Sequence, residues 1–321
     1  MRLGIGVGIV AWLIARMNVA ELLEALRRGA ANWPWLVTGC ALLLVALLAC
    51  GLRWQLVLKA QRLQIPVREV FRIFFVGQFF NLFMIGATGG DLVKAFLAAR
   101  TAGSRKTEAV SSVLIDRIIG LTALAFLAGV MVLLRADTFF DDPSLRPIGI
   151  FILAFAGLML LAVVAPFSRY GTKNPRFAGR DMLPAPGRRL AAILRRAYEA
   201  WIVCRRNPAL LCQTFALSLV NHLLAVAACI AFGRALTLHL GIIDYLTYIP
   251  VIGVFGAIPL TPGGLGLREG AAVILLAPAG VARPEAVLLS LLLYAGLTVW
   301  SLFGGLWFVR STSRGRRERE K

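Results

Sequence analysis

The candidate functional residues of this sequence are the polar residues and glycines that interrupt its apolar stretches. A helix N-terminus presents unpaired amide donors and the positive end of the helix dipole, so it attracts anions. Glycine lets another group approach the backbone closely, and a nearby lysine or arginine adds positive charge. These features indicate an anionic ligand such as a lipid phosphate. The predicted substrate-binding residues are Asn81, Gly89, Gly90, Asp91, Lys94, Asp116, Arg117, Gly263, Gly264, Arg268 and Glu269.

Two Gly-Gly-x-x-x-basic motifs contain most of these residues. Gly89-Gly90 precedes Lys94, and Gly263-Gly264 precedes Arg268, so matching positions differ by 174 in residue number. Paired glycines favour a break in a helix. We therefore expect a half-helix to begin beside each glycine pair, with its N-terminus directed at the interior of a membrane.

The half-helices are expected to begin near Asp91 and near Leu265. Two roles remain open for Asp91: its carboxylate could accept the first free amides of its own half-helix as an N-cap, or it could contact the substrate, and both could hold. Gln78 and Asn81 precede the first break. They are candidates to satisfy backbone groups that the break frees, and direct substrate contact is the weaker alternative.

Asp116 and Arg117 are adjacent opposite charges in an apolar segment. A charge near the bilayer centre costs about 2.5 kcal/mol or more, so it usually marks a functional site or a buried ion pair. An ion pair joining Asp116 to Arg268, or Arg117 to Glu269, would compensate these charges. Since consecutive helical side chains point about 100° apart, one residue of each couple could pair while its neighbour faces a cavity. Arg53 is expected to extend to the membrane interface.

The composition indicates a membrane protein. Hydrophobic residues make up 59% of the 321 residues, and the mean hydropathy is +0.78. A soluble domain has roughly 45–50% apolar residues. The net charge of +19 could suggest a nucleic-acid partner, but the arginines lie between apolar stretches and act there as topology signals, so no nucleic acid is expected. Five cysteines without regular spacing and two isolated histidines predict no disulfide framework, metal or cofactor.

The predicted fold class is an all-α polytopic membrane protein with about six full spans plus two re-entrant broken helices arranged as an inverted repeat. A spanning helix needs roughly 20 apolar residues. Two further apolar regions, at about 67–100 and 242–277, are interrupted by glycine or proline and are expected to break inside the membrane. The six predicted spans lie at about 3–17, 33–58, 108–134, 147–167, 208–232 and 286–309.

Basic loops predict the orientation of the chain. The stretch 168–208 holds ten Lys and Arg residues, and a basic tail follows Arg310, so both are expected to be cytoplasmic. The first broken region then enters from the cytoplasmic side and the second from outside, with both termini cytoplasmic. Residues 188–206 are amphipathic and are expected to lie on the membrane surface. The predicted organisation is a single transmembrane domain over 1–321, with inverted halves at 1–135 and 146–310, a basic loop at 168–207 and a tail at 311–321.

An internal repeat follows from aligning the two breaks. Pro34 and Pro208 open two predicted spans and share the offset of the glycine motifs. Each half then contains an odd number of crossings, which inverts the second copy, and inverted repeats with broken helices are a known transporter architecture. Coincidence is the alternative, because glycine and proline are common in membrane proteins and few other residues match.

Three segments of the sequence resemble the transmembrane, flippase-like region of the lysylphosphatidylglycerol synthase family. These are 81–94, 116–120 and Pro262 to Ala271, of which the last is the most specific. The resemblance covers nearly the whole chain and implies movement of an aminoacylated phospholipid across a bacterial or archaeal cytoplasmic (inner) membrane. The sequence ends eleven residues after Arg310, so no synthase domain and no aminoacyl transfer are expected. Met84-Ile85-Gly86 replaces the proline that the family pattern predicts.

The leading functional hypothesis is a lipid flippase or transporter that moves an anionic or aminoacylated phospholipid, or another lipid phosphate. Its expected partners are membrane lipids with phosphate headgroups. One alternative is an intramembrane enzyme acting on a lipid phosphate with Asp91, Asp116 or Glu269 as base. The sequence contains no P-loop, zinc-ligand cluster or paired nucleophile, so no enzyme activity is expected. Another alternative is a scaffold that recruits a lipid-synthesis enzyme through the basic loop.

Overall fold

The fold is helical throughout the described part of the chain. The structure, a computed structural model, describes residues 19–83, 89–164, 208–258 and 261–317. Five helices in these ranges are long and apolar enough to cross a membrane. They are α3 (Trp33–Ala60), α6 (Lys106–Leu134), α8 (Arg146–Val164), α10 (Pro208–Ala235) and α13 (Arg283–Arg317).

These five helices confirm an all-α polytopic membrane protein and match five of the six predicted spans. The sixth, at 3–17, lies outside the described residues, as does the basic loop at 168–207 with its predicted surface helix. Within the described ranges an amphipathic helix, α2 (Val19–Ala31), precedes α3, and a short helix, α7 (Ala136–Phe140), connects α6 to α8.

The two interrupted apolar regions form pairs of short helices. The first region forms α4 (Val67–Phe83) and α5 (Gly89–Thr101). The second forms α11 (Ile242–Ala257), the 3-10 turn η3 (Pro262–Gly264) and α12 (Leu267–Leu276), followed by a second turn, η4 (Ala277–Ala279). Each helix has between 10 and 17 residues, which is below the roughly 20 residues of a span. The breaks therefore occur where the glycines predict them.

The two glycine pairs act for different physical reasons. Gly263 and Gly264 have φ angles of 59° and 73°, a left-handed conformation that side chains with a Cβ rarely adopt. Gly90 instead lies inside α5, where a Cβ would come within 2.0 Å of the Gly77 carbonyl oxygen in α4. The second pair turns the chain, whereas Gly90 allows α4 and α5 to pack in direct backbone contact.

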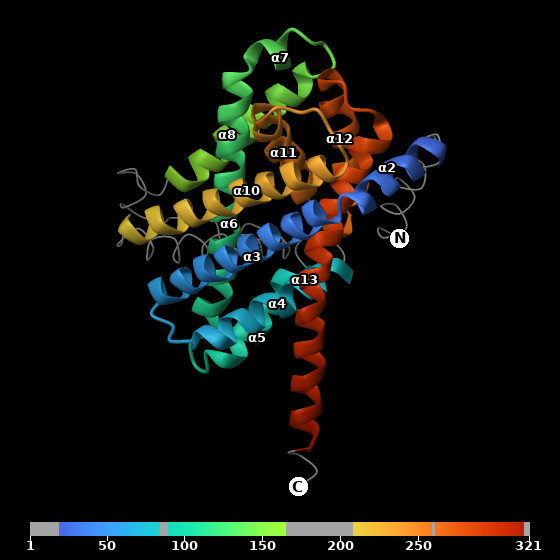
Figure 1. The fold of residues 1–321 in the computed structure, drawn as a ribbon. Helices are drawn as coiled ribbons and strands as arrows, with labels where there is room; N and C mark the ends of the chain where they lie inside the picture. The colour runs from blue at the N-terminus through green and yellow to red at the C-terminus, as the bar shows by residue number, and fades with distance from the viewer. Residues whose placement is uncertain (1–18, 84–88, 165–207, 259–260, 318–321) are drawn as a thin grey trace, which may run out of the picture.

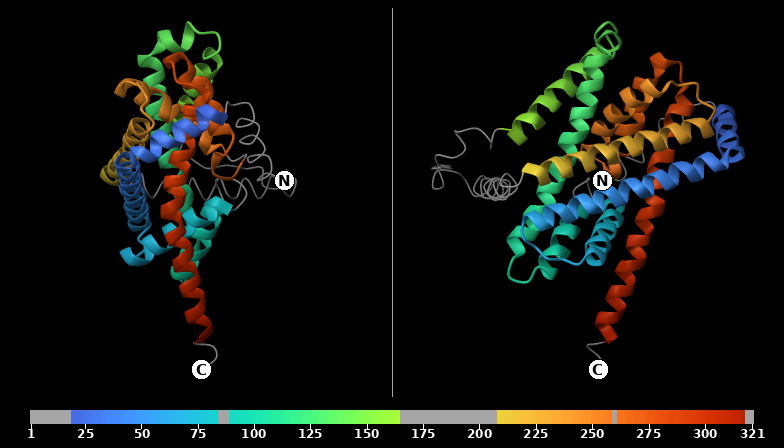
Figure 2. Two further views of the ribbon diagram at one scale, coloured as in Figure 1. Left: turned by 45° about the vertical axis from the view of Figure 1, so that its right-hand side comes forward. Right: turned by 60° about the vertical axis from the view of Figure 1, so that its left-hand side comes forward.

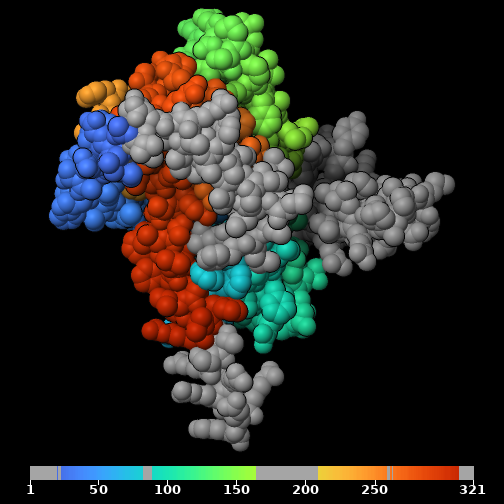
Figure 3. Space-filling view, turned by 90° about the vertical axis from the view of Figure 1, so that its right-hand side faces the viewer, coloured from blue at the N-terminus to red at the C-terminus, as the bar shows by residue number. Residues whose placement is uncertain are grey.

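The helices occur in two equivalent sets. The start of α10 follows that of α3 by close to the predicted offset of 174, and the same holds for α11 after α4, and for α13 after α6. In both sets the helix before the break packs against the last long helix of the other set: α4 contacts α13, and α11 contacts α6. Figure 3 shows the first of these contacts, where α13 (red) adjoins α4 (cyan).

Helices α3 and α10 lie side by side and run in opposite directions, obliquely to α6 and α13 (Figures 1 and 2). They bring the two sets together, so that both breaks approach the same region between α6 and α13. The outer faces of the long helices carry exposed leucines, among them Leu158, Leu160 and Leu161 of α8 at 54–63% exposure. Exposed apolar faces of this kind suit a chain whose surroundings are lipid.

Candidate functional site

A cavity of about 380 Å³ lies where the two breaks meet. It is lined by residues of both helix sets, including the α4–α5 pair, the turn η3 and the long helices α3, α6, α10 and α13. Seven of the eleven predicted site residues line it, whereas Gly89, Gly90, Gly264 and Glu269 do not. The predicted residues in its wall are Asn81, Asp91, Lys94, Asp116, Arg117, Gly263 and Arg268.

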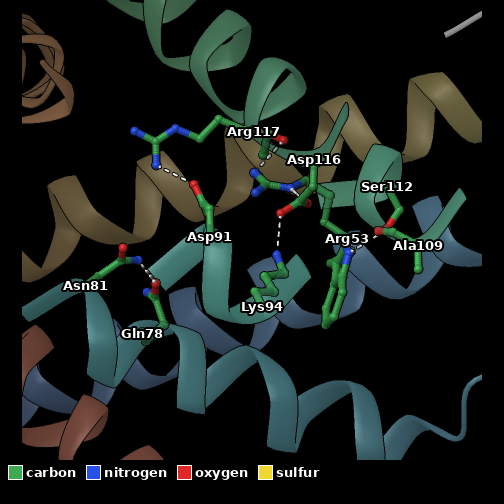
Figure 4. A network of polar contacts seen from close by, with 11 residues as sticks. Arg53, Gln78, Asn81, Asp91, Lys94, Ala109, Ser112, Asp116 and Arg117 are labelled. Atoms are coloured by element: carbon green, nitrogen blue, oxygen red, sulfur yellow. Dashed lines mark hydrogen bonds and ion pairs between the residues drawn. The ribbon is translucent and has the colours of Figure 1, made fainter. Parts of the chain in front are cut away.

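Asp116 of α6 holds two cations from two other helices (Figure 4). Arg53 of α3 donates from Nε to Oδ1 at 2.8 Å, and Lys94 of α5 donates from Nζ to Oδ2 at 2.9 Å. The three side chains are only 5–8% exposed. Because both carboxylate oxygens are used and a charge-assisted bond is stronger than a neutral one, this centre ties α3, α5 and α6 together.

The prediction that Arg53 extends to the interface is wrong. Arg53 is buried, and besides Asp116 it donates from a terminal nitrogen to the Ser218 hydroxyl of α10 at 3.0 Å. A counter-charge and a hydroxyl satisfy the guanidinium inside the protein, so it has no need to reach water. Gly120 of α6 provides the space, since a Cβ there would lie 2.9 Å from the same guanidinium.

Lys94 is fixed from a second direction by an aromatic ring. Its Nζ lies 4.1 Å from the centroid of the Trp54 ring, within the range of a cation–π interaction. The Trp54 indole donates to the Ser112 hydroxyl at 3.2 Å, and Ser112 donates to the Ala109 carbonyl (Figure 4). Lys94 therefore has little freedom to leave Asp116.

Asp91 and Arg117 form a more exposed ion pair at the cavity. Arg117 donates to the Asp91 carboxylate at 2.9 Å, and both side chains are 26% exposed. Asp91 does not act as the N-cap of α5, because Asn81 takes that role: its Oδ1 accepts from the Gly90 amide at 2.8 Å. The Asn81 amide nitrogen donates in turn to Gln78. The expectation that Asn81 satisfies a freed backbone group is confirmed.

Glu269 is completely buried, and its side chain caps the N-terminus of its own half-helix, α12. Its Oε2 accepts from the Gly266 amide at the start of α12, at 2.6 Å. Its Oε1 accepts from Arg268 at 3.1 Å and from the Ser290 hydroxyl at 2.8 Å, and Arg268 also donates to Ser290. This end of α12 is thus occupied by the chain's own carboxylate rather than open to an anion.

The predicted ion pairs between Asp116 and Arg268 and between Arg117 and Glu269 are therefore wrong. The kinked glycine turn places Glu269 over the start of its own helix, where it meets a free amide and Arg268 together. Asp116 is already saturated by two cations, and Arg117 has Asp91. Asp91, Asp116 and Glu269 are each compensated within their own half of the molecule.

Two residues that sequence reasoning missed, Arg53 and Ser290, complete the site. Ser290 follows Asp116 by 174 residues, just as Arg268 follows Lys94. In both halves the basic residue of the half-helix therefore bonds to the same position of the next long helix. The repeat offset was the signal that could have identified Ser290. Arg53 has no equivalent, because position 227 is alanine.

The charge of the cavity wall favours an anion. Four cations, Arg53, Lys94, Arg117 and Arg268, line it together with two acids, Asp91 and Asp116. Glu269 compensates Arg268 from behind the wall, which leaves a surplus of one positive charge in the first half. Within the described ranges no group of three or more His, Cys, Asp or Glu residues is placed to hold a metal ion.

Comparison with known proteins relates the whole chain to one family. A family model described as the lysylphosphatidylglycerol synthase TM region matches residues 1–304. A relative, a UPF0104 membrane protein of Methanothermobacter thermautotrophicus, is 22% identical over 293 residues, which cover 86% of this chain and 84% of that protein. The family match extends across the two breaks and ends within α13.

Proposed function

We propose a lipid-transport function for this chain, which belongs to the family of lysylphosphatidylglycerol synthase transmembrane regions. The family indicates a lipid-related function in a membrane. One observation supports transport of a charged headgroup: a cavity with four cationic and two acidic side chains lies inside an apolar helical bundle, between its two equivalent helix sets. Buried charge of this density is expensive in a membrane, and it usually marks a substrate path.

The Asp91–Arg117 pair is the proposed contact for the lipid phosphate. Asp116 pairs with two cations, whereas Asp91 pairs with one, Arg117. Both Asp91 and Arg117 are partly exposed. A phosphate can accept two parallel bonds from an arginine, so it can compete with one carboxylate oxygen for Arg117. Asp91 would then be released to accept from a hydroxyl or ammonium group of an aminoacylated headgroup.

Part of the cavity wall is apolar and suits the part of the lipid next to its headgroup. Leu121 and Leu124 of α6, Ile249 of α11 and Leu293 and Leu297 of α13 line it. A cavity of about 380 Å³ is large enough for a headgroup but not for two acyl chains, so the chains would remain in the bilayer. The two equivalent helix sets would rock against each other and expose the site to each leaflet in turn.

Headgroup translocation in vesicles tests this proposal. The purified chain is reconstituted into liposomes with fluorescent phosphatidylglycerol, and dithionite reports which leaflet holds the label. Arg117→Ala should slow translocation at least tenfold, because the phosphate loses its charge-assisted bonds. Arg27→Ala on α2, exposed and remote from the cavity, is the matched control and should leave the rate unchanged. A wild-type rate in Arg117→Ala would overturn the proposal.

The proposal places the chain in the cytoplasmic membrane with both termini inside, as the basic loops predict. It also involves no covalent chemistry. Mass spectrometry of lipids incubated with the pure chain should therefore show no new product, and a product would favour the enzyme hypothesis. If the chain acts only when a lipid-synthesis enzyme co-purifies with it, the result would favour the scaffold hypothesis.

A further inference from the structure

We propose that the turn between α3 and α4 forms a second anion site, separate from the central cavity, which binds the phosphate of an anionic phospholipid at the membrane surface. An open hollow of about 760 Å³ lies at this turn, and its wall consists of Lys59, Arg62, Leu63, Gln64, Ile65 and Pro66. None of these residues lines the central cavity. The site is therefore independent of the transport function proposed above.

The backbone conformation of Arg62 is the first observation that points to a role for its side chain. Helix α3 ends in a turn in which the Arg62 amide donates to the Lys59 carbonyl and the Leu63 amide to the Leu58 carbonyl, both at 2.9 Å. This turn requires a left-handed residue, usually glycine, and Arg62 has a φ of 56°. An arginine is strained there, and retained strain of this kind clusters at functional sites.

A second arginine, Arg105, stabilises the turn through hydrogen bonds to its carbonyl groups. Arg105, between α5 and α6, donates to the carbonyls of Gln61 at 2.9 Å and Arg62 at 2.8 Å. Its Nε also bonds to Glu108. The carbonyl oxygens of the turn are therefore engaged, and they do not repel an anion that approaches the exposed side.

The positive charge of the hollow is not compensated within the described part of the chain. Lys59 and Arg62 are exposed, and neither side chain has an ion pair or hydrogen bond with a described residue. The two nearby acids are engaged elsewhere: Glu108 with Arg105 and Glu69 with Arg72. An anion that binds here would meet two uncompensated cations.

The apolar part of the hollow favours a lipid over free phosphate. Leu63 and Ile65 are 5% and 8% exposed and anchor the turn in the core beside Trp54. Val67, the first residue of α4, is 48% exposed next to Pro66. A ligand with a phosphodiester and an acyl chain can use both the cations and this apolar edge, and an inorganic phosphate can use only the cations.

The equivalent turn at the end of α10 shows that the fold does not require these charges. Thr237 adopts the same left-handed conformation, with a φ of 58°, and the Leu238 amide closes the same bond to Gly233. There Arg28 is compensated, because it donates to Thr237 and pairs with Glu285 at 3.0 Å, and the exposed Arg234 lies 4.7 Å from the centroid of the Trp35 ring. The basic hollow lies at the end of the α3–α10 pair where α3 turns into α4, and it would bind lipid from that membrane surface.

Native mass spectrometry of the full chain in detergent tests the site with phosphatidylglycerol, phosphatidylcholine and inorganic phosphate as separate probes. Arg62→Gly removes the charge and relaxes the backbone, so it should weaken phosphatidylglycerol binding without loss of thermal stability. A basic residue near a membrane surface contributes about 1 kcal/mol, so we expect binding about fivefold weaker for Arg62→Gly and again for Lys59→Ala. Arg283→Ala, exposed at the start of α13, is the control and should bind like the wild type.

Wild-type phosphatidylglycerol binding by the Lys59→Ala/Arg62→Gly double variant would overturn the proposal, as would equally tight binding of phosphatidylcholine. Inorganic phosphate that binds as tightly as phosphatidylglycerol would overturn the assignment to a lipid. Arg117→Ala should retain binding at this surface site even where translocation is lost, so failure of the two proposals can be distinguished.

Discussion

Asparagine in place of Asp116 tests whether the buried charge centre holds three helices together. Asparagine has nearly the same shape, so the substitution creates no cavity. It removes the negative charge and turns an NH₂ donor toward Arg53 or Lys94, both of which lie within 2.9 Å of the present oxygens. Two cations that are each less than 10% exposed are then left without a counter-charge.

The expected loss of stability follows from the distances and burial. At these separations and an effective dielectric of about 20, each attraction is worth roughly 6 kcal/mol before the cost of desolvation is subtracted. Removal of one member of a buried pair typically costs about 3–5 kcal/mol, because the remaining charge stays buried and unpaired. We expect Asp116→Asn to lose free energy of unfolding in that range.

Asp91→Asn is the matched control, because it makes the same chemical change in an ion pair that is 26% exposed and single. A partly exposed pair contributes about 0–1 kcal/mol. Thermal unfolding in detergent, followed by tryptophan fluorescence, should therefore place the Tm of Asp116→Asn about 6–12 °C below that of Asp91→Asn. Equal melting temperatures would refute the reasoning that Asp116 is structural and Asp91 is not.

Three further substitutions can be measured in the same unfolding assay. Gly90→Ala should lower the free energy of unfolding by about 1–3 kcal/mol, because its Cβ would meet the Gly77 carbonyl oxygen. The control is Gly157→Ala in α8, where a Cβ meets nothing within 4 Å and no stability should be lost. Similar melting temperatures for the two variants would contradict the close contact of α4 and α5. Glu269→Gln should lower the free energy of unfolding by about 3–5 kcal/mol, because Arg268 would stay buried without the Glu269 carboxylate as its counter-charge. Wild-type stability would exclude a structural role for the charge. Ser290→Ala should lower the free energy of unfolding by about 1–3 kcal/mol, because Arg268 and Glu269 both lose a hydrogen-bond partner. An unchanged melting temperature would show that the hydroxyl is dispensable.

The repeat explains why the two halves of the cavity differ in their availability to a ligand. In the first half the acid on the half-helix, Asp91, pairs across to α6 and faces the cavity. In the second half position 265 is leucine, and Glu269 instead closes the start of its own helix. The first half is therefore the part of the cavity with exposed, exchangeable charge, and it is where substitutions should act most strongly on a ligand.

The family resemblance and the comparisons lead to the same family by different routes. The short motifs around Gly89 and Gly263 carry the resemblance, whereas the family model extends over residues 1–304. The charges and volume of the cavity are what narrow the proposed ligand to a headgroup with a phosphate.

The sequence by itself determined the helical class, the five described spans, the positions of both breaks and five of the six charged residues of the cavity wall. These features depend on local properties: a spanning helix needs a long apolar run, and glycine and proline interrupt it wherever they occur. The 174-residue offset also comes from the sequence, and the equivalent helices begin within a few residues of this offset.

Only the tertiary structure decided which charges pair. The partner of Asp116 depends on how α3 crosses α6, and this crossing brings in Arg53, a residue 63 positions away with no motif around it. Likewise, the kink at Gly266 determines that Glu269 folds back on its own helix. Ion pairs in a low-dielectric interior are set by distances of a few ångströms between helices, and residue spacing along one helix does not fix such distances.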